Sequence, residues 1–365
     1  MSENITRASR EWASRPDDQR YLTIADLKAA VMRRKVESWT STPRTADLRV
    51  IPADGNNLAI ELYDPSKGER REVSPTNWSF SQLAAYAQAP ASYLRKLPAE
   101  LAAINLQWGL EANPQREDTL ILAQSNGENH LRAMTSTSYG RIWDHQVVEA
   151  VESVQNGRWQ IPAATYATTN PKRATTLYAS DRDVFIFLVD PKNPIEVGGE
   201  QLFRGFYTWN SEVGSAVFGL TTFLYRYVCD NRIIWGATDV KELRIRHTGG
   251  APDRFAYEGQ RYLKRYAEES TEKIAEGIVA AKNFDLTREV NSGKGETVQD
   301  WLQKRGFTKA QATASYQTAV AEQGQARSLW DIVNGITAHA RSISHTDDRV
   351  ALETKAGKLM ELVAK

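Results

Sequence analysis

The sequence predicts an α+β protein with an antiparallel or mixed central sheet built from hairpins, flanked by helices and followed by a helical C-terminal part. Short apolar runs rich in β-branched and aromatic residues are separated by turn signals in the first two thirds of the chain. Helices are expected after pairs of strands rather than after every strand, which argues against alternating βαβ units. Beyond Gly249-Gly250, alanine, glutamate, lysine and glutamine dominate, and this composition favours helices.

The composition divides the chain into four segments. The first has no apolar periodicity and is expected to be a flexible arm. The second mixes helical and strand patterns, the third is rich in strand-forming residues, and the fourth is helical. The four segments are 1–20 for the arm, 21–115 for an N-terminal α+β subregion, 116–250 for a β-rich core and 251–365 for a helical C-terminal region.

In the second segment, local signals predict a helix, a hairpin and several short helices. Thr23 is placed to cap a helix whose apolar residues keep helical spacing up to Val36. Asp54-Gly55 is a strong turn signal between apolar runs at 48–51 and 58–63, so a hairpin is expected there. Three small helices are expected to follow, with starts marked by Ser79 or Ser81, by Pro90 and by Pro98.

The third segment begins with a second hairpin, formed by residues 119–123 and 130–134. Asp144 can cap the helix that follows. The continuous apolar run at 184–189 is typical of a central strand, buried on both faces. These strands and the stretch 204–247 are expected to form one central sheet.

The stretch 204–247 is the richest in aromatic and β-branched residues and is expected to be the centre of the fold. Residues 203–209 suit a strand. The run 216–228 fits a buried strand or a buried helix, and its helical spacing favours the helix. Residues 243–247 alternate apolar with basic residues, so a strand would place Ile245 inside and Arg244 and Arg246 together on the outer face.

The fourth segment contains several alanine-rich runs with helical periodicity, separated by glycine-bearing loops. Trp301, Leu302, Phe307 and Trp330 are expected to be among their packing residues. The predicted helices are 253–281, 297–305, 308–323, 328–341 and 347–363.

The composition of the 365 residues, 41% hydrophobic and 25% charged, is that of a soluble globular protein. A net charge of +1 excludes a protein that is basic over its whole surface and wraps nucleic acid, but it allows a local basic surface.

The single cysteine, Cys229, excludes an internal disulfide and fits a reducing compartment. No apolar run approaches the ~20 residues of a membrane span, and the polar N-terminus is unlike a signal peptide, so a cytoplasmic location is expected.

The sequence predicts no catalytic residues, no metal site and no cofactor. A metal site needs several ligands at suitable spacing, and only His339 and His345 of the five histidines are close in the sequence, too far apart for one helical face. Gly198-Gly199 and Gly293-Lys294-Gly295 lack the glycine spacing of phosphate-binding loops. Cys229 has no basic neighbour in sequence that would activate it as a nucleophile.

One pattern indicates a ligand, namely a set of cationic and aromatic residues around the expected sheet. Such a mixture suits single-stranded nucleic acid, since cations contact the backbone while rings stack on unpaired bases. The alternative is that the rings are core residues and the arginines solvate the sheet edges. The predicted nucleic-acid-binding residues are Arg141, Lys172, Arg173, Arg204, Trp209, Arg226, Arg232, Arg244 and Arg246.

Several stretches of the chain resemble one known family. They are WSFSQLAAYAQAPASYLRKLP at 78–98, YGRIWDHQVVEAV at 139–151, LWDIVNGITAHARSI at 329–343, and the pattern from NSEVGSAVFGLTTFLYRYVCDN to LRIRHT that begins at Asn210. Together they are similar to the phage/plasmid-like protein family, domain of unknown function 932. The resemblance implies an origin in prophages, plasmids or integrated elements, and it assigns no reaction.

The residues and the resemblance together favour a non-enzymatic nucleic-acid-binding protein of a phage, plasmid or integrated element, such as a single-stranded DNA binding or annealing factor in DNA recombination. The expected partners are single-stranded DNA and further copies of the chain, joined through the helical C-terminal part, because a repeated weak site gains affinity for a polymer. The alternative is a counter-defence or host-modulating effector that binds a host or element-encoded protein and no nucleic acid. The near-neutral net charge fits this alternative.

Overall fold

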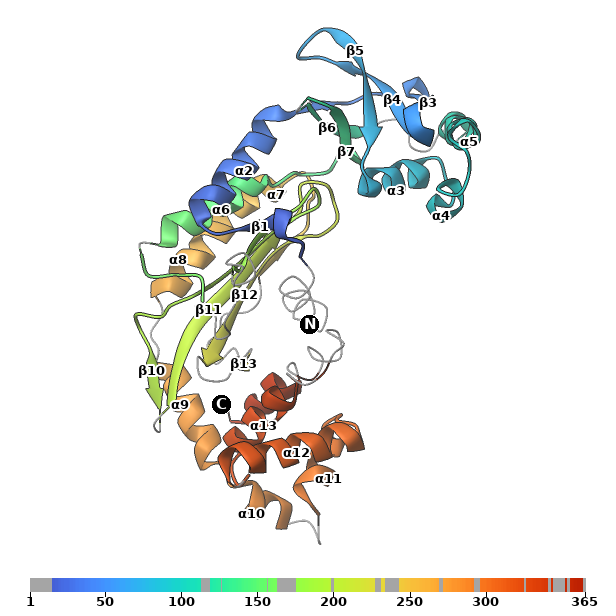
Figure 1. Ribbon diagram of the computed structural model, residues 1–365. Helices are drawn as coiled ribbons and strands as arrows, with labels where there is room; N and C mark the ends of the chain where they lie inside the picture. The colour runs from blue at the N-terminus through green and yellow to red at the C-terminus, as the bar shows by residue number, and fades with distance from the viewer. Residues whose placement is uncertain are drawn as a thin grey trace.

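The described part of the chain forms two β-sheets, each covered by helices, and a C-terminal group of helices (Figure 1). The sheets and the C-terminal helices follow one another from the top to the bottom of Figure 1. The α+β class and the helical C-terminal part are confirmed. The computed structural model describes residues 15–112, 119–125, 127–155, 157–162, 175–197, 200–226, 231–233, 243–268, 272–291, 296–324, 326–340 and 355–363, and the single residues 343 and 352.

The large sheet has eight strands, and all of its pairings are antiparallel. Its main path runs β1 (Arg20–Tyr21), β8 (Leu177–Ala179), β9 (Val184–Val189), β11 (Glu200–Asn210), β12 (Phe218–Arg226) and β13 (Asn231–Ile233), while β10 (Ile195–Val197) pairs with β11 and β14 (Leu243–Ile245) pairs with β12. Helices α2 (Ile24–Glu37) and α6 (Asp144–Gln155) cover one face, as Figure 1 shows. The core between them contains Leu27, Val151 and Phe206.

The small sheet has six strands in the order β2 (Ser38–Ser41), β6 (Leu120–Ser125), β7 (Asn129–Thr135), β5 (Glu69–Pro75), β4 (Asn57–Asp64) and β3 (Arg49–Ala53). It is mixed, because β5 and β7 pair in parallel while its other pairs are antiparallel. Helices α3 (Asn77–Tyr86), α4 (Ala91–Leu94) and α5 (Ala99–Ala112) share its hydrophobic core.

Several local predictions are confirmed in the N-terminal part of the chain. Thr23 caps α2 by accepting a hydrogen bond from the backbone N–H of Asp26. Strands β3 and β4 form the predicted hairpin, in which Gly55 takes a positive φ of 68°. Helix α3 begins earlier than expected, because Thr76 rather than Ser79 or Ser81 is its cap. The N-terminal part also contains short 3₁₀ helices at Asp17–Gln19, Thr45–Asp47 and Asp54–Asn56.

The prediction of one central sheet from residue 119 to 247 is wrong. The hairpin β6–β7 pairs instead with β2 on one side and with β5 on the other, so it belongs to the small sheet. A hairpin has two open edges, and here both are filled by strands from the N-terminal half of the chain. These pairings join residues far apart in sequence, which composition cannot reveal.

Within the run 216–228, residues Phe218–Arg226 form strand β12 rather than the favoured helix. Its neighbour β11 pairs with it from Leu202–Arg226 to Trp209–Gly219, and β14 pairs on its other side. Gly219 makes this register possible, because a Cβ there would lie 2.0 Å from a ring carbon of Trp209. Strand partners on both sides therefore override the local helical spacing.

The C-terminal part is helical, as predicted. It contains α7 (Ala251–Arg254), a π-helical turn (Phe255–Gly259), α8 (Gln260–Glu268), α9 (Glu272–Asn283), α10 (Leu286–Asn291), α11 (Val298–Lys304), α12 (Lys309–Gln323) and α13 (Leu329–Ala340). The predicted packing residues Trp301, Leu302, Phe307 and Trp330 are all buried in one cluster. The short helix α10 was not expected, since six residues show too little periodicity.

Candidate nucleic-acid interface

The nine residues predicted to bind nucleic acid are placed in different environments. Four of them have side chains outside the described part of the chain, namely Lys172, Arg173, Arg226 and Arg232. Arg141, Arg204 and Trp209 are buried, with exposed fractions of 8%, 3% and 1%. Arg244 and Arg246 are exposed and Ile245 is fully buried between them, which confirms the orientation predicted for this strand.

Trp209 is a core residue rather than a surface platform for bases. Its ring stacks on Tyr207 with the centroids 5.5 Å apart, and Tyr207 stacks on Phe185 at 5.7 Å. The cluster that contains these rings lies on one face of the large sheet and also includes Arg204's neighbour, Phe203. The assignment of Trp209 and Arg204 to a nucleic-acid surface is therefore corrected, because a buried side chain cannot contact a nucleic acid in solution.

Arg141 is held inside the protein by loop 211–217, which connects β11 to β12. Its Nε donates a hydrogen bond of 2.9 Å to the backbone carbonyl of Glu212. Its guanidinium carbon lies 5.7 Å from the ring centroid of Tyr139 and 5.4 Å from that of Trp143. These contacts give Arg141 a structural role. Its prediction as a nucleic-acid-binding residue is therefore corrected as well.

Loop 211–217 also carries a buried ion pair between the two sheets. Glu212 Oε2 lies 2.8 Å from Nη2 of Arg132, which is on β7 of the small sheet, and both side chains are at most 2% exposed. The other oxygen of Glu212 accepts a hydrogen bond of 2.9 Å from the backbone N–H of Asp144. Asp144 in turn accepts a hydrogen bond of 2.8 Å from Asn210 and lies 3.4 Å from Arg34 Nη1. We call Arg34, Arg132, Asn210, Asp144 and Glu212 the charged joint.

The environment separates the pKa values of the two carboxyl groups in the charged joint. Burial and the nearby charge of Glu212 raise the pKa of Asp144 well above its ordinary value. Burial also opposes ionisation of Glu212, but Arg132, Arg34 and the Asp144 amide outweigh it and hold the pKa of Glu212 below its ordinary value. Each of these carboxyl groups is only 1% exposed, so neither can contact a ligand in solution. We therefore assign the charged joint a structural role, which is to connect the two sheets.

A basic and aromatic surface lies on the helices that follow β14. Arg254, Tyr257, Arg261 and Lys264 are spaced by three or four residues along α7, the π-helical turn and α8, and we call them the basic stripe. Tyr257 is 68% exposed. Arg261 Nη1 donates a hydrogen bond of 3.2 Å to the Tyr257 hydroxyl, and Arg254 pairs with Glu258 at 3.1 Å.

The basic stripe borders an open groove of about 750 Å³ between α8 and the end of α6. Arg158, Arg261 and Lys264 bring three cations to its lining, against one carboxylate, Glu268. Arg158 is the most constrained of the three, since it pairs with the buried Asp190 at 2.5 Å. The groove therefore has a positive wall with a tyrosine ring on it.

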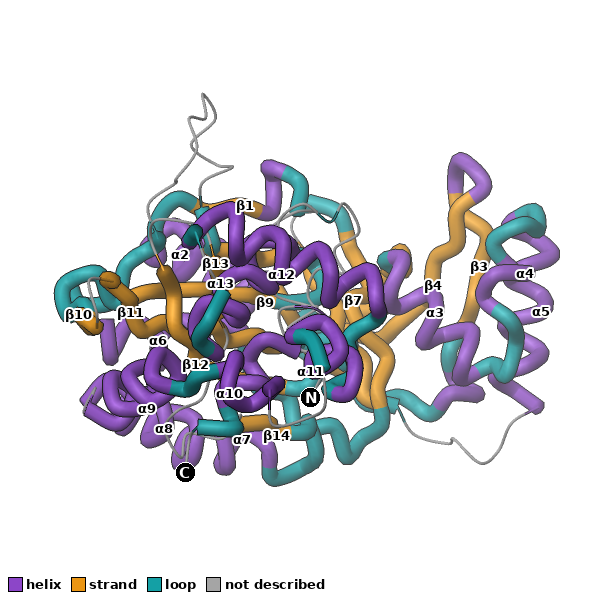
Figure 2. Tube along the Cα trace, turned by 90° about the horizontal axis from the view of Figure 1, so that it is seen from below, coloured by secondary structure: helices purple, strands orange, loops and turns teal. Residues whose placement is uncertain are grey.

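Arg244 of β14 and Arg246, which follows this strand, are exposed and precede the basic stripe closely in sequence, because only residues 246–250 separate β14 from α7. Figure 2 shows β14 and α7 side by side at the lower edge of the molecule. Between residues 243 and 268 the chain has six Lys or Arg residues and three Asp or Glu residues, an excess of positive charge that the net charge of the whole chain conceals.

The sequence predicts a helix over residues 253–281, but the stripe was not predicted. The available signal was the spacing itself, since residues at i, i+3, i+7 and i+10 share one helical face. The aromatic residues of β11 favoured that strand instead, and their rings are interior.

No three His, Cys, Asp or Glu side chains within the described ranges are grouped so that they could hold a metal ion. Across the same residues, none of the helices combines the length and apolar character that a bilayer span requires.

A family model described as Domain of unknown function (DUF932) matches residues 130–357, more than half of the chain. The chain belongs to the DUF932 family. No curated protein and no solved structure matches it. The DUF932 region contains loop 211–217, β14 and the basic stripe, whereas β2 to β6 of the small sheet precede it. The charged joint therefore ties the DUF932 region to α2, because Arg34 lies outside the match and its ion-pair partner Asp144 lies inside it.

Proposed function

We propose that this DUF932 protein binds single-stranded nucleic acid along the basic stripe and its groove, without catalysing a reaction. The observation that supports the proposal is the exposed ring of Tyr257 beside Arg254, Arg261 and Lys264. Cations in such a groove contact phosphates, and an exposed ring stacks on a base of any identity. A base in a duplex is already stacked, so an unpaired strand is the better ligand.

The proposal includes the context of a mobile genetic element. A single-stranded DNA binding or annealing factor of a phage, plasmid or integrated element needs no nucleotide hydrolysis, and the stripe supplies charge and stacking alone. Such a protein would act on DNA during recombination in the cytoplasm of the host.

The first test is the salt dependence of oligonucleotide binding to Arg261→Ala plus Lys264→Ala. Affinity for a single-stranded oligonucleotide should fall, and the slope of log affinity against log salt should decrease by about 1.4, since each lost phosphate contact removes about 0.7 on a single strand. The matched control is Arg44→Ala plus Arg49→Ala, two exposed cations elsewhere on the molecule. Binding to the wild type that is absent or insensitive to salt would favour the protein-binding effector instead.

The second test is Tyr257→Ala. Loss of one stacked base is expected to cost ~1–3 kcal/mol of binding free energy with little change in the salt slope, because stacking releases few counterions. Tyr63→Ala is the control, since Tyr63 is 54% exposed on the small sheet. Fluorescence anisotropy and thermal unfolding on the same preparations separate binding from stability. Equal affinities of the two variants would remove Tyr257 from the interface.

Self-association would raise affinity for a polymer, because each further copy adds one more site. We place the interface on α5 rather than on the C-terminal helices, since Leu101, Ile104 and Trp108 are 50%, 64% and 72% exposed on one face of α5. An antiparallel pair of α5 helices from two copies would also bring Glu111 of one copy toward Lys96 of the other, seven and eight residues from Ile104.

Light scattering tests this interface. The wild type is expected to show a multiple of 41.0 kDa, and Trp108→Glu is expected to show the single-chain mass, because a carboxylate would replace the central apolar contact. Val279→Glu on α9 is the control, with Val279 46% exposed. A wild type that stays at the single-chain mass at high micromolar concentration, with and without oligonucleotide, would contradict self-association.

A further inference from the structure

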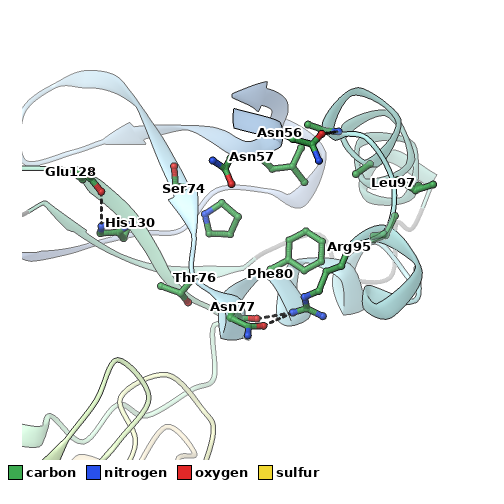
Figure 3. Close-up of a pocket in the computed structure, with 15 residues that line it drawn as sticks. Asn56, Asn57, Ser74, Thr76, Asn77, Phe80, Arg95, Leu97, Glu128 and His130 are labelled. Atoms are coloured by element: carbon green, nitrogen blue, oxygen red, sulfur yellow. Dashed lines mark hydrogen bonds and ion pairs between the residues drawn. The ribbon is translucent and has the colours of Figure 1, made fainter. Parts of the chain in front are cut away.

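A second concave site lies on the small sheet, away from the basic stripe. It has a volume of about 610 Å³, within the range of small-molecule sites. Figure 3 shows it between the end of β5, the start of α3 and the segment that carries Arg95 and Leu97. Asn56 helps to form it by accepting a hydrogen bond of 2.7 Å from the Ala99 N–H, which fixes the start of α5.

Arg95 is held at the mouth of this pocket by neutral groups. Its Nη2 lies 2.7 Å from Asn77 Oδ1, 2.9 Å from the Asn77 carbonyl and 2.9 Å from Ser81 Oγ. Within the described residues it forms no ion pair, so no carboxylate neutralises its charge. Because all three acceptors contact Nη2, the Nη1 and Nε donors are left for an anion. Both two-donor edges of a guanidinium include Nη2, so each of these donors offers a single charge-assisted hydrogen bond.

The same guanidinium covers one aromatic ring of the pocket. The Arg95 guanidinium carbon lies 4.7 Å from the centroid of Phe80, and both side chains appear together on one wall in Figure 3. Pro75, Leu94 and Leu97 add apolar surface to the lining of the pocket. A flat ring is the ligand part that such a wall accommodates best.

The opposite end of the pocket is polar. Asn57, Ser74 and His130 line it, and His130 Nε2 lies 3.5 Å from a carboxylate oxygen of Glu128. Amide, hydroxyl and imidazole groups offer both donors and acceptors to the edge of a heteroaromatic ring. The site thus combines an apolar wall, a polar end and a preorganised cation.

We propose that this pocket binds a nucleotide, with the base against Phe80, the edge of the base toward Asn57, Ser74 and His130, and the phosphate on Arg95. The inference does not rest on strand binding by the basic stripe, because the residues of the two sites are distinct. The nucleotide is either free or part of a strand, and both sources share the chemistry of an aromatic base with a phosphate.

The test is calorimetric titration of the full chain with adenosine monophosphate and cytidine monophosphate. Arg95→Gln should weaken binding by about ten- to a hundredfold, since it removes charge-assisted hydrogen bonds to the phosphate. Phe80→Leu keeps an apolar side chain without an aromatic ring and should weaken binding by about five- to a hundredfold through lost stacking. Lys67→Gln is the matched control, because it makes the same change of charge at an exposed residue of the turn between β4 and β5, outside the pocket lining.

Titration with inorganic phosphate and with the nucleosides completes the test. Each should bind more weakly than the monophosphates. Phosphate binding as tight as that of the monophosphates, or a folded Arg95→Gln variant with unchanged affinity, would overturn the proposal. Thermal unfolding of each variant confirms that it is folded.

Competition with an oligonucleotide identifies the source of the nucleotide. Displacement of bound monophosphate from the pocket supports a nucleotide within a strand, and continued binding supports a free nucleotide. The Arg261→Ala plus Lys264→Ala variant should retain monophosphate binding, so failure of the stripe proposal and failure of the pocket proposal give different results.

Discussion

Glu212→Gln is expected to lower the free energy of unfolding by about 3–5 kcal/mol, because it leaves the buried charge of Arg132 without its partner. The glutamine side chain keeps the shape of glutamate, so packing is preserved and the effect reports the lost charge. Arg132 and Glu212 are both almost inaccessible to water, which prevents solvent from replacing the missing partner. Urea denaturation at neutral pH measures the difference.

Asp144→Asn is the matched control within the charged joint. Burial already opposes ionisation of Asp144, and an amide can still accept the hydrogen bond from Asn210. At neutral pH this variant is therefore expected to be at least as stable as the wild type, because the neutral amide has no ionisation that burial opposes. Equal losses of stability for Glu212→Gln and Asp144→Asn would contradict the assignment of the charge to Glu212.

The two carboxyl groups should also respond to pH in opposite directions. The pKa of Glu212 is lowered on folding, so its contribution is present above its unfolded value of 4.5 and is lost as pH falls through the folded pKa. The pKa of Asp144 is raised on folding, so its contribution is present below 3.8 and is lost as pH rises through the folded pKa. The stability of Asp144→Asn relative to the wild type should accordingly increase as pH rises. Thermal unfolding of both proteins at a series of pH values measures this difference.

Trp209→Ala is expected to cost ~3–5 kcal/mol of stability, as large aromatic truncations in a core do. The stacked contact with Tyr207 and the close packing over Gly219 would both be lost. Oligonucleotide affinity per folded molecule should not change, because the ring does not reach the surface. A stably folded Trp209→Ala with weakened single-strand binding would return Trp209 to the interface.

Elements with local signals could be predicted from the sequence. A cap such as Thr23, a turn such as Asp54-Gly55 and the alanine-rich periodicity of α12 and α13 all act within a few residues. The division into two sheets could not be predicted, since the pairing of β7 with β5 depends on segments separated by α3, α4 and α5.

The candidate site was predictable only in part. Alternation around Ile245 correctly placed Arg244 and Arg246 outside, because burial of one strand face has a period of two. Arg141 and Arg204 are of the same residue type yet buried. The position of Arg141 follows from a backbone acceptor and neighbouring rings that only the assembled fold provides. Residue type alone therefore cannot separate interior arginines from those available to a ligand.

The N-terminal strands have a consequence for the order in which the chain folds. β1 completes the large sheet by pairing Arg20 with Tyr178, and β2 completes the small sheet by pairing Ser38 with Gln124. During synthesis, α2 and both of these strands leave the ribosome well before their partners exist. Until then each strand presents unpaired backbone groups, which favours transient pairing with other chains. Folding dominated by such distant contacts is slow, so refolding yield should fall steeply as protein concentration rises.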